Sequence, residues 1–360
     1  MSDVEKAVVA KAEQLVSSGK ERGLQVAAYV DGQLAVDVAV GVADPATGRA
    51  VEPGTLFYNW SIGKGATATL VHRLVGAGAL TYDTRVAELW PAFAKHGKDA
   101  ITVRQALDHS AGVPGLPAGV TVDDACSWPT MVTALEEARP WWQPGTKVGY
   151  HAYTFGYLNG EIVRRAGGRE LADLLAELTA ELGHPGEIRY GMAPDETGSL
   201  AVLEDAPMPD GTGEFQPPQE LLRAAPMALF PTAALGSDPR VLAADIPAGA
   251  KVTARALARL YAGWLDGTVV SPDLAPTAYT ESSSGPDQVY GNPSRWSLGF
   301  VLGLPFDGER TPRVFGMAGA GGSWAGADPD RRIAVAVTKN VLSMDFETVT
   351  ALVTAVYEAT

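Results

Sequence analysis

The chain has 360 residues, which is enough for one large domain or for two interleaved ones. Hydrophobic residues make up 46% and charged residues 19%, a composition that is typical of globular proteins and not of disordered ones. The net charge is -14, from 28 lysines and arginines against 42 acidic residues, and no basic cluster offsets it, which argues against nucleic acid and anionic membrane surfaces as partners.

The first residues, MSDVEKAVVAKAEQLVSSGK, lack the basic start, apolar core and cleavage site of a secretory signal. No run of about 18 apolar residues occurs, so we expect a cytoplasmic protein without a membrane span. Cys126 is the single cysteine, which excludes an internal disulfide and a multi-cysteine metal site. We expect no metal and no cofactor, because metal-ligand spacing is absent among the five histidines, His72, His96, His109, His151 and His184.

In chain order, apolar residues at helical spacing predict a first helix within residues 4–16. The pair Asp31-Gly32, flanked by runs of valine, alanine and tyrosine, predicts a β-hairpin. From Ser61 to about residue 290 the pattern is mainly helical, with clear helices at 102–110, 152–166, 171–182 and 253–267. Residues 193–249 are rich in proline, glycine and acids and predict an irregular surface excursion.

Strand patterns return near the end, in 296–303, 313–319 and 332–340, before a final amphipathic helix at 346–359. We therefore expect an α+β fold, with one antiparallel sheet built from both termini and flanked by the terminal helices. The expected domains are the sheet, from 1–59 and 294–360, and an inserted, mainly helical region, 60–293. A site is expected where the two meet.

Ser61 and Lys64 are three residues apart at the start of a predicted helix, so both side chains can point into one cleft. A serine hydroxyl becomes a good nucleophile only when a base takes its proton, and a lysine serves as that base only if burial and nearby positive charge lower its pKa. The spacing alone is weak, because Ser17 and Lys20 match it as well. For the match taken alone, a solvated lysine beside a helix-capping serine is the better interpretation.

Three other segments favour a site at Ser61. Its context, FYNWSIGKGA, combines aromatic and small residues, as in a buried cleft. The loop LDHSAGVPG, residues 107–115, ends a helix. Tyr150 stands just before another helix, where its phenol can share a proton with Lys64 and pass it to a leaving group. A core aromatic with its hydroxyl at the rim is the alternative for Tyr150.

These motifs together resemble the serine β-lactamase and penicillin-recognising family, in particular its class C-like esterase and transacylase branch. The S-x-x-K motif corresponds to residues 61–64, the tyrosine motif to 150–152, and the K-T-G or H-x-G strand to 317–319. Residues 107–114 resemble the family's L-x-H-x-S-G-L loop, and residues 253–264 resemble a helix that is usual in this branch. The resemblance covers nearly the whole chain, with the motifs in the family's order, and it implies the β-lactamase/DD-peptidase fold.

The resemblance implies roles for single residues. Ser61 corresponds to the acylated nucleophile, and Lys64 and Tyr150 to the coupled base and acid. The backbone N–H groups of Ser61 and Ala320 correspond to the oxyanion hole. Gly319 is expected to leave room for the acyl group along its strand. The residues expected to contact substrate are Met317, Gly319, His151 and Trp324.

Two positions depart from the family pattern. Ala152 replaces the asparagine of the second motif, which removes a polar contact to a β-lactam side chain. Met317 replaces the lysine or histidine of the third motif, which removes a cation that could hold a substrate carboxylate; the alternative is that Met317 only fills space. Both changes disfavour β-lactam and D-Ala-D-Ala substrates.

We therefore expect a serine acyl-enzyme that passes the acyl group of a carboxylic ester to water, or to an amine or alcohol acceptor as in natural-product biosynthesis. Trp60, Trp141, Trp142 and Trp324 would wall an apolar cleft, although core packing explains them equally well. The alternatives are β-lactamase or D-Ala-D-Ala peptidase activity, or a catalytically silent binding protein with the same fold.

Overall fold

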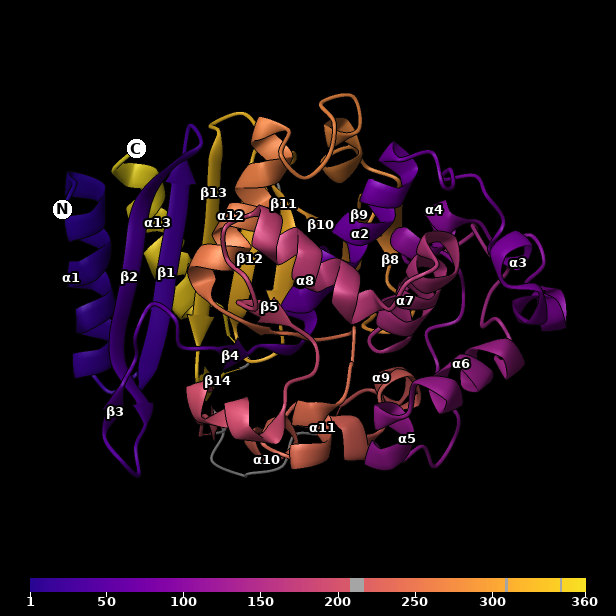
Figure 1. The fold of residues 1–360 in the computed structure, drawn as a ribbon, viewed down its shortest axis with the longest axis horizontal. Helices are drawn as coiled ribbons and strands as arrows, with labels where there is room; N and C mark the ends of the chain where they lie inside the picture. Colours follow the sequence, from indigo (N-terminus) through magenta and orange to yellow (C-terminus); the bar gives the residue numbers. More distant parts are fainter. Residues whose placement is uncertain (208–216, 308–309, 344) are drawn as a thin grey trace.

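A large antiparallel sheet forms one side of the molecule, and a mainly helical part forms the other (Figure 1). The computed structural model describes residues 1–207, 217–307, 310–343 and 345–360. In spatial order the nine strands of the sheet are β3 (Arg49–Ala50), β2 (Gln33–Asp44), β1 (Gly23–Val30), β13 (Ile333–Lys339), β12 (Ser323–Asp328), β11 (Phe315–Gly319), β10 (Val301–Leu302), β9 (Pro293–Trp296) and β8 (Ser283–Pro286). Strands from the two ends of the chain therefore meet where β1 pairs with β13.

The helical part consists of α2 (Lys64–Gly76), α3 (Val86–Leu89), α4 (Val103–Leu107), α5 (Val122–Cys126), α6 (Trp128–Glu137), α7 (Thr154–Gly167) and α8 (Leu171–Glu181). Short helices follow at α9 (Gln219–Ala224), α10 (Ala233–Gly236) and α11 (Pro239–Ala243). The 3-10 turns are η1 (Trp60–Gly63), η2 (Pro91–Gly97), η3 (Pro194–Ser199), η4 (Met227–Leu229) and η5 (Ala275–Ala278). Small strand pairings join β4 (Phe57–Tyr58), β7 (Lys251–Val252) and β5 (Ile188–Arg189), and β14 (Val341–Leu342) with β6 (Glu204–Asp205).

The predicted hairpin at Asp31-Gly32 is confirmed. Both residues have positive φ, 46° and 76°, and they connect β1 to β2 with Val30 opposite Gln33. Two left-handed residues give a turn whose twist matches that of the flanking strands, and aspartate and glycine tolerate this conformation.

Alternation along the central strands separates two faces of the sheet. On β13, Val335 and Val337 point to the outer face, where α1 (Asp3–Ser17) and α13 (Glu347–Glu358) pack together, as Figure 1 shows near the two termini. Ala334 and Ala336 point to the inner face, where α12 (Ala254–Asp266) crosses β1, β12 and β13. Small side chains on the inner face let this helix lie close to the sheet.

The structure corrects the predicted boundary of the sheet. β8 begins at Ser283, before residue 294, and α12 belongs to the packing of the sheet. The sequence of β8, SSGP, lacks the alternation of a half-buried strand because it forms an exposed edge. The excursion predicted for 193–249 contains several short helices, and its residues 208–216 lie outside the described residues.

In the part of the chain that the structure describes, we find no helix with the length and apolarity needed to cross a membrane.

Candidate active site

Ser61 lies in the 3-10 turn η1, directly before α2, at the junction of the sheet with the helical part. The preceding residue, Trp60, is buried and has a left-handed φ of 41°, which is rare for a bulky residue. Its ring stacks on that of Tyr58 at 4.8 Å, so packing holds this unfavourable conformation. A Cβ on Gly63 would lie 2.7 Å from the backbone carbon of Gly249, so glycine is needed where the two segments meet.

The side chain of Lys64 is fully buried beside Ser61. Its Nζ lies 2.9 Å from Ser61 Oγ and 3.1 Å from the carbonyl oxygen of Ala248. Burial lowers the pKa of Lys64 to about 7, because the charged ammonium loses its hydration. Burial alone accounts for the lowered pKa of Lys64, so the nearby positive charge expected from the sequence is not required. A neutral amine, which can accept a proton, is therefore populated near neutral pH.

Tyr150 contacts the same oxygen from the other side. Its Oη donates a hydrogen bond to Ser61 Oγ at 2.8 Å, and Lys64 Nζ lies 5.1 Å from the centre of its ring. Burial, with a smaller contribution from Tyr290, raises the pKa of Tyr150, so the phenol keeps its proton at neutral pH and acts as a donor. Ser61 and Tyr150 are only partly buried, so a small molecule can reach them.

The strand β11 passes beside η1, and Gly319 is its last residue. A Cβ on Gly319 would lie 2.2 Å from the carbonyl oxygen of Asn59, so the close approach of this backbone requires a glycine here. This gives a different reason from the predicted one, room for an acyl group. Asn59 also donates its side-chain N–H to the carbonyl oxygen of Lys339 on β13 at 3.0 Å. The backbone just before Ser61 is thus held against two strands of the sheet, and Ala320 follows at the end of β11.

Met317 is buried between Val148 and Trp296, and this cluster packs against Tyr150. Of the two alternatives for Met317, the structure favours space filling, since the side chain is only 1% exposed. Trp296 also stacks on Tyr150, with ring centroids 5.7 Å apart. Met317 and Trp296 therefore belong to the cluster that packs against Tyr150 and helps to hold its phenol in place.

Two predicted substrate contacts need correction. His151 is buried, and its Nε2 accepts the backbone N–H of Val113 at 3.0 Å. Its Nδ1–H then donates to the carbonyl oxygen of Gly149 at 2.7 Å. Burial lowers the pKa of His151 to about 4, so the imidazole is neutral and both of its nitrogens are engaged in hydrogen bonds to the backbone. Trp324 lies fully buried in the outer core beneath the terminal helices, on the face of β12 turned away from Ser61.

The tryptophans expected to line an apolar cleft are also mostly part of the packed interior. Trp60 and Trp142 are buried, and Trp142 donates to the carbonyl oxygen of Ser110. Trp141 is partly buried, and the guanidinium of Arg223 lies over its ring at 4.2 Å. Packing therefore explains these side chains.

Sequence reasoning missed Asp287, His109 and Tyr290, all of which lie close to Tyr150. Asp287 accepts the backbone N–H of Tyr150, and the His109 ring lies 5.1 Å from the Tyr150 ring. Tyr290 is 46% exposed, with its ring 5.6 Å from that of Tyr150. His109 lies in the loop noted above, and Asp287 follows a proline as turn-forming aspartates often do, but no local pattern indicates Tyr290.

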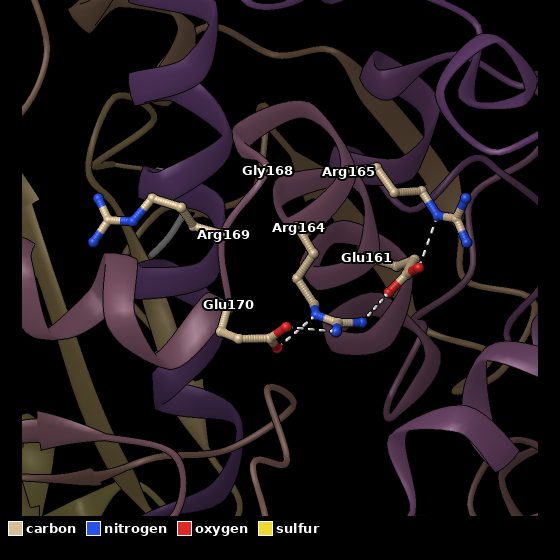
Figure 2. Close-up of a pocket in the computed structure, with 6 residues that line it drawn as sticks. All are labelled: Glu161, Arg164, Arg165, Gly168, Arg169 and Glu170. Carbon is tan, nitrogen blue, oxygen red and sulfur yellow. Dashed lines mark hydrogen bonds and ion pairs between the residues drawn. The ribbon is translucent and has the colours of Figure 1, made fainter.

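A surface hollow of about 320 Å³ at the C-terminal end of α7 is a separate feature (Figure 2). Arg164 pairs with Glu161 and Glu170, and Arg165 pairs with Glu161, while Arg169 points away from them (Figure 2). Arg169 pairs with Glu177 outside the hollow, so each arginine has a carboxylate partner. Tyr150 precedes the opposite end of α7, which has 14 residues and is therefore about 20 Å long at 1.5 Å per residue. We assign no part of the site to this hollow.

Within the described residues, no group of three or more histidine, cysteine, aspartate or glutamate side chains is placed to hold a metal ion. Ser61 Oγ lies between the amine of Lys64 and the phenol of Tyr150, an arrangement suited to nucleophilic attack and proton transfer.

Comparison with known proteins identifies the family of the chain. A family model described as Beta-lactamase matches residues 8–357. The chain is 33% identical over 347 residues to the esterase/beta-lactamase LipL of Mycobacterium tuberculosis (strain ATCC 25618 / H37Rv), covering 89% of this chain and 77% of that protein.

Solved structures give the same result. A family VIII carboxylesterase is similar with a TM-score of 0.90 and 29% identity, covering 100% of this chain and 98% of the other. A penicillin-binding protein homologue from Caulobacter crescentus is similar with a TM-score of 0.88 and 32% identity, covering 99% and 98%. The chain therefore has the predicted β-lactamase/penicillin-binding-protein fold, is a serine hydrolase, and belongs to the Beta-lactamase family.

Proposed function

We propose that the protein is a carboxylesterase that cleaves neutral carboxylic esters through an acyl-enzyme on Ser61. The observation that carries the proposal is the position of Ser61 Oγ, 2.9 Å from Lys64 Nζ and 2.8 Å from Tyr150 Oη. The serine hydroxyl can donate to the neutral amine while it accepts from the phenol. Such a pair supplies both the base and the acid that acyl transfer requires.

In the first half-reaction, Lys64 takes the proton of Ser61 as Oγ attacks the ester carbonyl. The negative charge on the carbonyl oxygen is stabilised by the backbone N–H groups of Ser61 and Ala320. The C–O bond to the alcohol then breaks, and Tyr150 protonates the leaving oxygen while Lys64 returns a proton to Tyr150. The products are the free alcohol and an ester of Ser61.

In the second half-reaction, a water molecule gives its proton to the same pair and attacks the acyl-enzyme. Collapse of the intermediate releases the carboxylic acid and returns the proton to Ser61. An amine or alcohol in place of water would receive the acyl group instead, which is the transacylase form of the proposal. Catalytic steps of this kind contribute about 10²–10⁴-fold each to the rate.

The preference for neutral esters follows from the side chains near Ser61. Met317 and Ala152 replace the polar family residues that would hold a carboxylate and an amide, and Met317 is buried. Tyr290 instead offers an exposed aromatic face beside Tyr150, suited to an aryl or alkyl group of the ester. The esterase and carboxylesterase among the relatives support this choice.

β-Lactam hydrolysis is the second candidate, since LipL is described as both an esterase and a beta-lactamase. The same acyl-enzyme chemistry would open a β-lactam ring. We place it second because Met317 replaces the cationic residue of the third motif that would bind the carboxylate of a β-lactam. The silent binding protein is not retained, because the chain belongs to a family of hydrolases.

The test is covalent labelling of Ser61. The protein is incubated with a fluorophosphonate or a p-nitrophenyl ester, and its intact mass is measured with and without added amines. We expect one adduct on the parent protein, none on Ser61→Ala, and an unchanged adduct on Ser17→Ala, which removes the serine of the other S-x-x-K match. An adduct that persists on Ser61→Ala would refute the assignment. Hydrolysis of a chromogenic cephalosporin that outpaces ester hydrolysis would favour the second candidate.

A further inference from the structure

The segment that carries Tyr150 has no helix or strand to hold it. Residues 147–151 are irregular, and α7 begins only at Thr154. Yet Tyr150 Oη must stay within hydrogen-bond distance of Ser61 Oγ if the phenol is to protonate a leaving group. Two consecutive backbone N–H groups in this segment donate to side chains from elsewhere in the chain, where regular structure would use backbone acceptors.

The first of these side chains is Asp287, in the loop between β8 and β9. Both of its carboxylate oxygens accept the backbone N–H of Tyr150, at 3.2 and 3.0 Å. One oxygen also accepts the N–H groups of Val289 and Tyr290, at 2.8 and 2.9 Å. The side chain is 3% exposed, so its charge is held by these donors and not by water. Asp287 thus folds its own loop and binds Tyr150 with the same group.

The second is His109, just after α4. Its Nδ1 accepts the backbone N–H of His151 at 3.0 Å, which places its proton on Nε2. Burial keeps the pKa of His109 well below its ordinary value, with His151 and Lys64 adding to the effect, so Nδ1 remains an acceptor at neutral pH. The ring is fully buried and packs on Trp296 and Phe155, with centroids 4.1 and 4.8 Å away.

The backbone of His109 gives an independent sign of constraint. Its φ is 62°, in the left-handed region, which is uncommon for residues other than glycine, although asparagine, aspartate and histidine adopt it more often than the rest. Such conformations persist only where the surroundings determine them, and they gather at functional sites. Here the conformation lets the ring of His109 reach both the N–H of His151 and the face of Tyr150.

We propose that Asp287 and His109 are positioning residues that hold Tyr150 beside Ser61 by accepting two consecutive backbone N–H groups. Neither residue touches the reacting atoms. The two acceptors come from different elements, so they restrain both translation and rotation of the segment. The inference rests on the proposed function, because it assigns a purpose to the placement of Tyr150.

The experiment is a double-mutant cycle with Tyr150→Phe. The single variants are Asp287→Ala and His109→Ala, and each is also combined with Tyr150→Phe. Ester hydrolysis gives kcat and KM, and fluorophosphonate labelling gives the rate at which Ser61 reacts. We expect each alanine variant to lower kcat about 10- to 100-fold with KM nearly unchanged, since a displacement of about 1 Å can cost that much. In the Tyr150→Phe background, the same substitutions should lower kcat less than threefold, because the group they position is already gone.

Conservative variants keep the test valid if an alanine variant fails to fold. Asp287→Asn and His109→Asn each retain an oxygen acceptor, and asparagine tolerates the left-handed backbone at position 109. Both should recover most of the lost kcat. Glu281→Gln is the control near β8, because Glu281 is an exposed partner of Arg295 and should leave kcat unchanged.

The outcomes separate the two proposals. Two results would overturn the positioning role alone. In the first, the loss of kcat in each alanine variant adds fully to the loss caused by Tyr150→Phe. In the second, kcat is unchanged in both alanine variants while the protein still labels at Ser61. An unlabelled parent protein would overturn the proposed function and this inference with it.

Discussion

Lys64 Nζ lies 2.9 Å from Ser61 Oγ, and burial alone brings the pKa of the lysine to about 7. The exposed pair with the same spacing differs in its surroundings. Lys20 is paired with Glu347 and Asp345, which raise its pKa, and Ser17 donates to the carbonyl oxygen of Gln14. The difference between a base and a surface charge is therefore one of burial.

The pH dependence of ester cleavage should follow Lys64. Because the neutral amine is the base, kcat/KM should rise with pH through about 7 and then level off. Lys64→Met should lower kcat by about 10²–10⁴-fold, while Lys20→Met should leave it unchanged. A profile measured from pH 5 to 9 with a neutral ester checks this, and a flat profile would contradict it.

Lys64 should also affect stability. An unfolded lysine has a pKa of about 10.4, so between about 7 and 10.4 the unfolded chain binds more protons than the folded protein. The contribution of Lys64 to stability therefore rises with pH across this window. The difference in unfolding free energy between the parent protein and Lys64→Met, measured in urea at pH 7 and pH 9, should shift in favour of the parent at the higher pH.

Gly319→Ala should damage both stability and activity. The added Cβ would meet the carbonyl oxygen of Asn59 at 2.2 Å and push η1 away from β11. We expect a loss of about 1–3 kcal/mol in unfolding free energy, with slower labelling of Ser61. Gly198→Ala is the matched control, since its Cβ would meet nothing within 4 Å. Equal behaviour of the two variants in urea titrations would show that the contact is unimportant.

Met317 should prove to be a packing residue. Met317→Ala should cost about 2–5 kcal/mol and reduce kcat, because Tyr150 loses part of its support. Met317→Leu, which nearly conserves volume, should cost less than about 1.5 kcal/mol and keep most of the activity. If Met317→Ala instead changed only KM, the side chain would be contacting substrate directly.

Tyr290 should select for the ester group that it contacts. Aromatic pairs contribute about 0.5–1.5 kcal/mol beyond burial, so Tyr290→Ala should raise KM for aryl esters about 2- to 10-fold. Tyr290→Phe keeps the ring and should behave like the parent protein. A series of aryl and short alkyl esters measures the effect, and an equal change for both classes would argue against stacking.

The sequence predicted features that depend on local chemistry. The Asp31-Gly32 turn is specified by two residues that tolerate positive φ, and the terminal helices by their apolar period. The fold followed from the resemblance, because several motifs in order constrain a whole topology. Features that depend on tertiary contacts were less accessible.

His151 and Trp324 show where the sequence was insufficient. Both belong to motif segments, but each side chain points away from Ser61 because of strand register or loop hydrogen bonds. Asp287 and Tyr150 are 137 residues apart, so no local pattern could join them. The prediction that the C-terminal part of the sheet begins at residue 294 was wrong for a similar reason, since β8 is recognisable only by its pairing with β9.

The hydrogen bond from Asn59 to β13 has a consequence for how the protein is made. The backbone before Ser61 is held by a strand near the end of the chain, and that strand also joins β1 to β12. Contacts between such distant segments form slowly and late. During synthesis, Ser61 leaves the ribosome long before β13, so the hydrogen bond that holds the backbone before Ser61 can form only after Lys339 has been made.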